Sequence, residues 1–302
     1  MGVSGGVGAL LREEIGEHIL SFHCMPHRLE LAMLDVQKSV PMIEKVYDLL
    51  QLVWKTYHCS PKSKRELKAI GMELGCAMRT PSAVKTQRWL PHVYRALSVF
   101  LAFDVTTGQG QYTAVHLHMQ HLAASSKNTE IRGRAMHISQ QMEKLPFVVL
   151  CHFLHDLFGE ISKLSLILQK NSVILPQAIA AIDSCVCTIK RMKDKPVRNG
   201  KLEEFLNYTN FNSVSQHDNV VEQDKAQREK QTRWQKKAAS SDYTGISFQN
   251  IPLKGCDLPG FSEELNHLID KTIDITVKEL ERRFEMMRDN TQHKNTKRAE
   301  II

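Results

Sequence analysis

The chain has 302 residues, of which 42% are hydrophobic and 24% are charged. This composition excludes a disordered tail and a disulfide-rich mini-domain, and the length allows one large domain or two. Forty lysine and arginine residues stand against 33 aspartate and glutamate residues, a formal net charge of +7. A surplus of this size permits an acidic or nucleic-acid partner but does not demonstrate one.

The cysteine pattern and the apolar stretches indicate the cellular setting. Seven cysteines are scattered without a paired framework, which favours a reducing compartment. The first residues lack the basic and apolar regions of a signal peptide, and polar residues interrupt each apolar stretch before it reaches membrane-spanning length. We therefore expect a soluble intracellular protein that does not bind a membrane.

Apolar periodicity predicts a mostly helical chain. Residues 6–18 show helical spacing, and the alternating apolar run at 19–24 is typical of a strand. After Pro26 the pattern is helical almost to the end of the chain. We predict helices that cover residues 43–57, 61–75, 89–103, 111–124, 130–144, 150–168, 175–189 and 261–287.

Three polar or turn-rich segments separate these helices. Residues 193–201 read as a basic linker with turns, residues 216–241 are strongly polar, and residues 251–260 read as a loop. Beyond Arg288 the chain is polar, and we expect the last helix to fray there.

The positive charge is concentrated in one segment. Nine basic residues and two acidic ones lie from Lys55 to Arg95, and the rest of the chain carries 31 of each sign. This segment is either a solvated helix face with a basic loop or a phosphate-facing surface. Within it, Lys85, Arg88 and Trp89 could bind an exposed base by stacking and its phosphate by charge, or could pack a helix start against the core.

Possible metal and catalytic sites are few. Cys24 and His27 have the residue types and spacing of half a zinc site, but no second pair stands nearby. We expect them to shape the turn into a helix instead. The sequence shows no paired carboxylates in a suitable frame, no nucleophile in a tight turn and no phosphate loop. We therefore predict no catalytic residue, no metal, no cofactor and no enzyme activity.

Two groups of polar residues fall on predicted helices. The first group comprises His116, His118 and His121, and we interpret these as surface histidines. The second group comprises His152, His155 and Asp156, and we interpret it as the polar edge of a helix that also has a full apolar stripe.

Four motifs occur in a characteristic order. They are residues 5–12 (GGVGALLR), residues 21–32 with Cys-x-x-His followed by Arg-Leu-Glu-Leu-Ala, residues 86–90 (TQRWL) and residues 160–169 (EISKLSLILQ). Together they resemble hAT-superfamily transposase-derived proteins, in particular the zinc-finger-862-like group. The resemblance extends from about Gly5 to Phe284.

The resemblance implies a mainly α fold in which a partial ribonuclease-H-like α/β core remnant carries a large all-helical insertion domain. Residues 1–60 would form the tail of the first half of the core, with a short helix, a strand and the Cys-x-x-His helix. Residues 61–245 would form the helical insertion. Residues 246–302 would form a loop and a long amphipathic helix that leads back to the core.

Catalysis in that family needs three acids that hold divalent metal. The resemblance places the first two upstream of Met1, and the third is not recognisable near Glu279 or Glu281. It therefore implies a catalytically inactive, domesticated or truncated transposase fragment.

Two pairs of residues match motifs of the family. Cys24 and His27 match the Cys-x-x-His motif, which gives structural support there. Arg88 and Trp89 match the Arg-Trp motif that handles a flipped base. The implied function is weak DNA binding in the nucleus. The alternative is a scaffold without DNA binding that contacts a protein partner or forms a homo-oligomer.

Overall fold

The computed structural model describes residues 10, 11, 13, 14, 24–84, 89–104, 108–208, 247–255 and 261–299. In this part the protein is mainly α, with ten named helices and one two-strand antiparallel hairpin. The elements are α2 (Met25–Ser39), α3 (Pro41–His58), α4 (Pro61–Glu73), α5 (Trp89–Phe100), α6 (Gln111–Ser125), α7 (Thr129–Met142), α8 (Leu145–Leu168), α9 (Leu175–Arg191), α10 (Lys201–Tyr208), β1 (Ser247–Phe248), β2 (Ile251–Pro252) and α13 (Phe261–Ala299).

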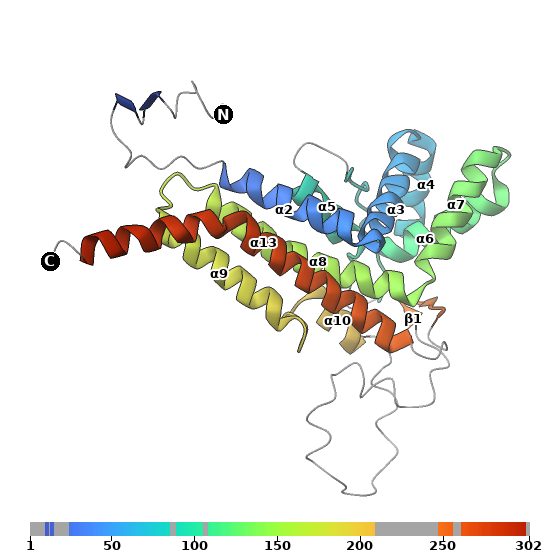
Figure 1. The fold of residues 1–302 in the computed structure, drawn as a ribbon. Helices are drawn as coiled ribbons and strands as arrows, with labels where there is room; N and C mark the ends of the chain where they lie inside the picture. Colours follow the sequence, from blue (N-terminus) through green and yellow to red (C-terminus); the bar gives the residue numbers. More distant parts are fainter. Residues whose placement is uncertain are drawn as a thin grey trace, which may run out of the picture.

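The helices form two groups that share one core. Figure 1 shows α13 crossing the molecule between α2 and α9 with α8 behind it, while α3, α4, α6 and α7 gather at the other end. A continuous set of buried apolar side chains runs from Leu29 in α2 to Met287 in α13. The ten named helices and the hairpin of the described chain therefore share this core.

Helix α8 lies at the centre of this core. Among the described helices it is the one long and apolar enough to match a membrane span, but 72% of that stretch is buried inside the protein. It packs against α5, α9 and α10. These contacts are typical of the core helix of a bundle.

Local signals explain where many helices begin. Five of them have proline in the first two positions, where the missing N–H costs no helical hydrogen bond. Ser60 caps α4 by accepting the backbone N–H of Ser63 at 3.1 Å. Asn128 caps α7 by accepting the N–H groups of Glu130 and Ile131 at 2.9 and 3.1 Å. The predicted helices of the described region are confirmed, with shifts at their ends.

Two helix ends differ from the sequence-based expectation. Helix α5 ends at Phe100 instead of near residue 103, because Phe103 pairs with Gly110 in an antiparallel bridge. A Cβ at Gly110 would lie 2.2 Å from the carbonyl oxygen of Ala102, so this close approach requires glycine. Helix α13 continues to Ala299, past the point after Arg288 where fraying was expected. The predicted fraying at this point was wrong.

The hairpin of β1 and β2 spans residues 247–252, so only β2 falls within the predicted loop at 251–260. Its turn residues Gln249 and Asn250 have φ values of 48° and 63°. Positive φ values at both turn positions are typical of two-residue hairpin turns. Phe248 packs edge-on against Tyr112 and His152, with ring centroids 5.1 and 4.9 Å apart. The hairpin therefore closes one end of the core.

The fold-class prediction is confirmed at its coarser level, a mainly α protein. In the part of the chain that the structure describes, β structure is limited to this hairpin and isolated bridges, and no ribonuclease-H-like core is evident. Most of the predicted helix at 6–18, the predicted strand at 19–24 except Cys24, and the polar segment 216–241 lie outside the described residues.

Candidate nucleic-acid interface

The residues singled out in the sequence are only partly visible. Lys85 and Arg88 lie outside the described residues, and Trp89 is the first residue of α5 with its side chain likewise outside them. Cys24 and His27 are exposed at the start of α2. Within the described ranges, no group of three or more His, Cys, Asp or Glu side chains could hold a metal ion. The structure thus brings no further ligand to Cys24 and His27.

Helix α4 and the loop that follows it carry most of the described basic residues of the 55–95 segment. The buried face of α4 is narrow and consists of Ser63, Leu67 and Gly71. Lys64 and Lys68 are one turn apart, a rise of about 6 Å along the same side of the helix. This leaves two lysines in a row beside the buried face.

The chain turns back sharply after α4. Gly75 has a φ of 69° and ends the helix in the left-handed region that favours glycine. The loop then passes so close to the helix that a Cβ at Gly71 would lie 2.2 Å from the Cγ atom of Met78. Both glycines therefore allow residues 76–84, called the return loop below, to pack against α4.

A small hollow of about 10 Å³, room for about one water molecule, lies between α4 and the return loop. Two lysines and one arginine are among its lining residues, and buried residues of α3 and α4 form part of its wall. We call it the basic hollow; it is lined by Tyr57, Lys64, Leu67, Lys68, Met78, Arg79, Thr80 and Pro81.

The cations of the basic hollow are not neutralised by nearby acids. Glu66 lies on α4, but its carboxylate binds the Nε2 atom of His118 at 3.0 Å and lies 3.6 Å from the Nζ atom of Lys62. In the part of the chain that the structure describes, no carboxylate lies within 4 Å of the charged groups of Lys64, Lys68 or Arg79. These three cations of the lining residues therefore have no ion-pair partner in the described part of the chain.

His118 is fully buried beneath α4 and joins three helices. Its Nδ1 atom lies 3.0 Å from the Tyr57 hydroxyl of α3, and its Nε2 atom contacts Glu66 of α4. Burial lowers the pKa of His118. The ring is therefore neutral at pH 7, accepts the Tyr57 O–H at Nδ1 and donates its Nε2–H to the carboxylate. This relay fixes the helix that carries the two lysines.

The expectation of surface histidines on α6 was wrong for two of the three residues. His118 and His116 are buried, whereas His121 is exposed. His116 places its Nε2 atom 3.1 Å from Glu143, and burial lowers its pKa. Helix α6 is covered on several sides, so His116 and His118 meet acidic partners from other segments instead of water.

The return loop is fastened by two glutamine side chains. The buried Gln111 accepts the backbone N–H of Arg79 at 3.0 Å and donates its amide to the carbonyl of Arg79 at 2.9 Å. The side-chain carbonyl of Gln51 accepts the N–H of Val84 at 3.2 Å. The backbone of Arg79 is therefore fixed while its side chain stays exposed beside the lysines.

The variant Gln111→Ala is expected to lower the free energy of unfolding by about 2 kcal/mol, because both backbone groups of Arg79 lose their partner. The amide proton of Arg79 should also exchange faster with solvent. Urea denaturation and hydrogen exchange measure the two effects. The exposed Gln120→Ala on the same helix is the control. Equal stability of the two variants would contradict the anchoring role.

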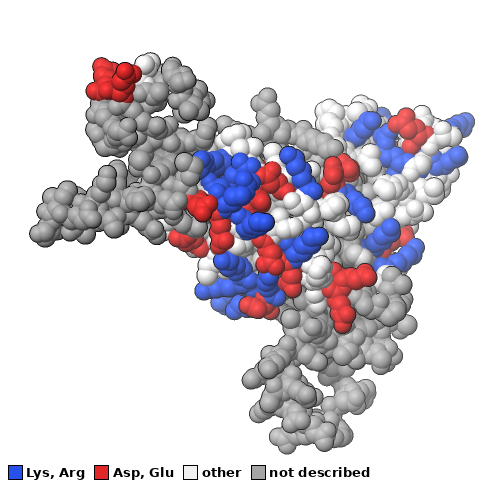
Figure 2. All heavy atoms as spheres, viewed as in Figure 1, with Lys and Arg blue, Asp and Glu red and all other residues white. Residues whose placement is uncertain are grey.

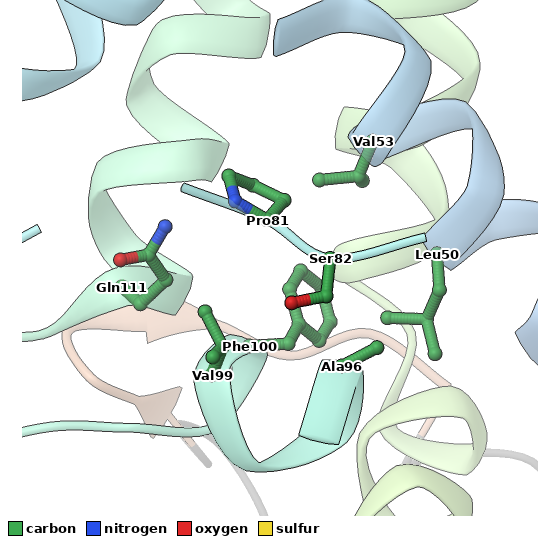
Figure 3. Close-up of a pocket in the computed structure, with 8 residues that line it drawn as sticks. All are labelled: Leu50, Val53, Pro81, Ser82, Ala96, Val99, Phe100 and Gln111. Carbon is green, nitrogen blue, oxygen red and sulfur yellow. The ribbon is translucent and has the colours of Figure 1, made fainter. Parts of the chain in front are cut away.

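A second, apolar crevice of about 10 Å³ lies near the same loop (Figure 3). Pro81 and Ser82 of the return loop line it together with apolar side chains of α3 and α5. Its one amide belongs to Gln111, which already binds the backbone of Arg79. The crevice therefore offers no free amide that could recognise a ligand, and we assign it to the packing of the return loop against the core. The other lining residues are Leu50, Val53, Ala96, Val99 and Phe100.

A chain of Ser98, His155 and Asp156 resembles a hydrolase triad by distance alone. The serine Oγ lies 3.1 Å from the Nε2 atom of His155, whose Nδ1 atom lies 3.2 Å from Asp156. However, the nearer acceptor for the serine proton is the carbonyl of Tyr94 at 2.8 Å. Asp156 also accepts the first backbone N–H groups of α10. We assign the cluster to holding α10 on α8.

The interpretation of His152, His155 and Asp156 as a polar helix edge was wrong for His152 and Asp156 and holds only for the partly exposed His155. His152 and Asp156 are 1% and 8% exposed. They are buried because α10 and the hairpin cover this side of α8: Phe205 and Phe248 both contact the ring of His152. No sequence pattern within α8 predicts that α10 and the hairpin cover it.

The face that carries α2, α13 and α9 has a different charge pattern. Figure 2 shows Lys and Arg side chains interspersed there with Asp and Glu side chains. Lys190 pairs with Glu281 at 3.0 Å, and Lys193 pairs with Asp274 at 2.6 Å. Ion pairs thus compensate positive charge on this face, in contrast to the basic hollow.

Comparisons with known proteins add no further constraint on this site. No family model matches the chain, and no solved structure matches it. The function of the basic hollow is therefore inferred from its own charges and geometry.

Proposed function

We propose that the protein binds nucleic acid, DNA foremost, through α4 and the return loop, with the basic hollow at the centre of the contact. The observation that carries this proposal is the convergence of Lys64, Lys68 and Arg79 on one hollow without a carboxylate partner within 4 Å among the described residues. Phosphates are the groups that such uncompensated cations attract.

The chain continues from the return loop directly into the Arg-Trp motif. Lys85 follows Val84, and Arg88 and Trp89 come four and five residues after Val84. We propose that these three residues extend the interface, with the tryptophan stacking on an exposed base and the cations binding phosphates. Such contacts carry little sequence information, so binding is expected to tolerate different sequences.

The finer assignment of the fold belongs to the same proposal. The four sequence motifs and the mainly helical structure support a nuclear protein derived from an hAT-like transposase. In this assignment the helices between residues 61 and 245 correspond to the insertion domain of that family, and residues before and after them to the remnant of its ribonuclease-H-like core.

The variants Lys68→Ala and Arg79→Ala are each expected to weaken DNA binding about tenfold, because each removes one charge-assisted phosphate contact. Fluorescence anisotropy with labelled single-stranded and hairpin DNA at two salt concentrations measures the dissociation constants. The control is Lys190→Ala, which removes the same charge from a residue paired with Glu281. Similar weakening by all three variants would show diffuse attraction and overturn the site; absence of binding by the wild-type chain would overturn the function.

A further inference from the structure

Two aromatic rings stack on each other at the end of α3. The ring centroids of Trp54 and His58 are 4.4 Å apart, and the ring planes are inclined by only 21°. Trp54 is half-buried at the edge of the apolar face of α3, and His58 is exposed. The indole covers one face of the imidazole, so the exposure of His58 comes from the opposite face and the ring edges. We call these two side chains the aromatic platform.

Exposed cations flank the aromatic platform. Lys55 lies on the last turn of α3, and Lys62 and Arg65 lie on the first two turns of α4, which begins three residues after His58. Lys62 lies 3.6 Å from Glu66. Among the residues that the structure describes, no carboxylate lies within 4 Å of the charged groups of Lys55 or Arg65. This corner therefore carries cations that attract the phosphates on either side of a base.

The aromatic platform adjoins the proposed interface. Gln51 lies one turn before Trp54 on the same side of α3. Its side-chain carbonyl accepts the N–H of Val84, at the end of the return loop, at 3.2 Å. Tyr57, the neighbour of His58 along α3, lines the basic hollow. A strand that lies along α4 and the return loop can therefore extend onto the platform.

An aromatic platform recognises bases that are not already stacked. Every base has a flat π-face, and stacking on protein aromatic side chains binds single strands with little dependence on sequence. In a duplex, the neighbouring base pairs occupy these faces. Because Trp54 already restrains the ring of His58, little side-chain ordering is needed when a base stacks on it.

Building on the proposed nucleic-acid binding, we propose that the aromatic platform is a stacking site for an unpaired base of a single strand. The base lies on the outer face of the His58 ring, and Trp54 supports that ring from the other side. Lys55, Lys62 and Arg65 attract the flanking phosphates. The protein would then distinguish a strand with unpaired bases from a backbone of the same charge that has none.

The test compares an oligothymidine with a chain of the same length and charge in which stable abasic sugars replace the bases. One stacked base is expected to tighten binding about tenfold. His58→Ala should therefore reduce the preference of the full chain for the oligothymidine about tenfold. His58→Phe keeps a flat ring without a titratable group and should retain the preference. Fluorescence anisotropy with end-labelled probes measures the dissociation constants.

The controls separate stacking from charge and from folding. His27→Ala removes an exposed imidazole from the start of α2 and should leave the preference unchanged. His58 is the exposed last residue of α3, so His58→Ala is expected to fold, and circular dichroism checks this. A purely structural effect of the variant would weaken the binding of both probes alike.

The outcomes also separate this inference from the function on which it rests. Equal binding of the two probes by the wild-type chain, or a preference that His58→Ala leaves unchanged, would overturn the stacking site and leave nucleic-acid binding in place. Loss of the preference in His58→Phe as well as in His58→Ala would show that a flat ring is not sufficient and would also overturn the stacking site. Binding of neither probe by the wild-type chain would overturn both proposals.

Discussion

The variant Asp156→Ala is expected to unfold with a free energy about 3 kcal/mol below that of the wild-type chain. Its carboxylate is 8% exposed and accepts the backbone N–H groups of Lys201 and Leu202 at 2.7 and 2.9 Å. It also binds the Nδ1 atom of His155 at 3.2 Å. Removing it deletes the cap of α10 and leaves buried donors without an acceptor.

The neighbouring Gly200 shows how closely this contact is built. A Cβ at that position would lie 2.4 Å from the Oδ2 atom of Asp156, so the chain can approach the carboxylate only with glycine there. Urea denaturation followed by circular dichroism measures the stability loss of Asp156→Ala. Asp194→Ala, at an exposed position in the segment 193–200 that precedes α10, is the matched control. A loss below about 0.5 kcal/mol, the usual effect of a surface substitution, would refute the capping role.

Lowering the pH from 7 to 4 is expected to reduce the free energy of unfolding by about 3 kcal/mol through His152 alone. Burial lowers the pKa of His152 to about 4 from 6.5. The unfolded chain therefore binds this proton near pH 6.5, whereas the folded chain resists it. Stability is lost as the pH falls below 6.5, and the loss from this residue levels off below pH 4.

The contacts of His152 explain why its ring stays neutral. Its Nδ1–H donates to the carbonyl of Val148 at 2.7 Å, and the rings of Phe205 and Phe248 lie against it with centroids 4.7 and 4.9 Å away. Burial lowers the pKa values of His116 and His118 in the same direction, so they add to the acid lability.

Urea unfolding of the wild-type chain and of His152→Gln between pH 7 and pH 4 isolates this contribution. The variant should show a shallower fall in stability, because its side chain takes up no proton in either state. His121→Gln, at an exposed position, should retain the wild-type slope. Identical slopes for the wild-type chain and His152→Gln would contradict the assignment.

Periodicity predicted the long helices because their stripes and their Pro and Gly boundaries are local signals. Helix α10 has only eight residues, and its cap is Asp156, 45 residues away from Lys201, so no local pattern revealed it. The hairpin was missed for a similar reason. Its turn residue Gln249 binds Thr113 of α6, which is 136 residues away.

The candidate site was located in part by charge counting alone. Counting charged residues placed the whole surplus of positive charge between Lys55 and Arg95. Helix α4 and the return loop lie inside that segment. The hollow itself was not predictable, because it depends on Gln111 binding the backbone of Arg79 from 32 residues away. The buried state of His118 was missed because its partner Glu66 lies 52 residues earlier.

The salt dependence of DNA affinity tests the central claim most directly. If the three cations of the basic hollow each neutralise one phosphate, the logarithm of the binding constant should fall linearly with the logarithm of salt concentration, with a slope of about −2 to −3. The variant Arg79→Ala should reduce the steepness by about 1, and Lys190→Ala should leave it unchanged. A slope near zero, or a slope that Arg79→Ala does not alter, would contradict phosphate binding at the basic hollow.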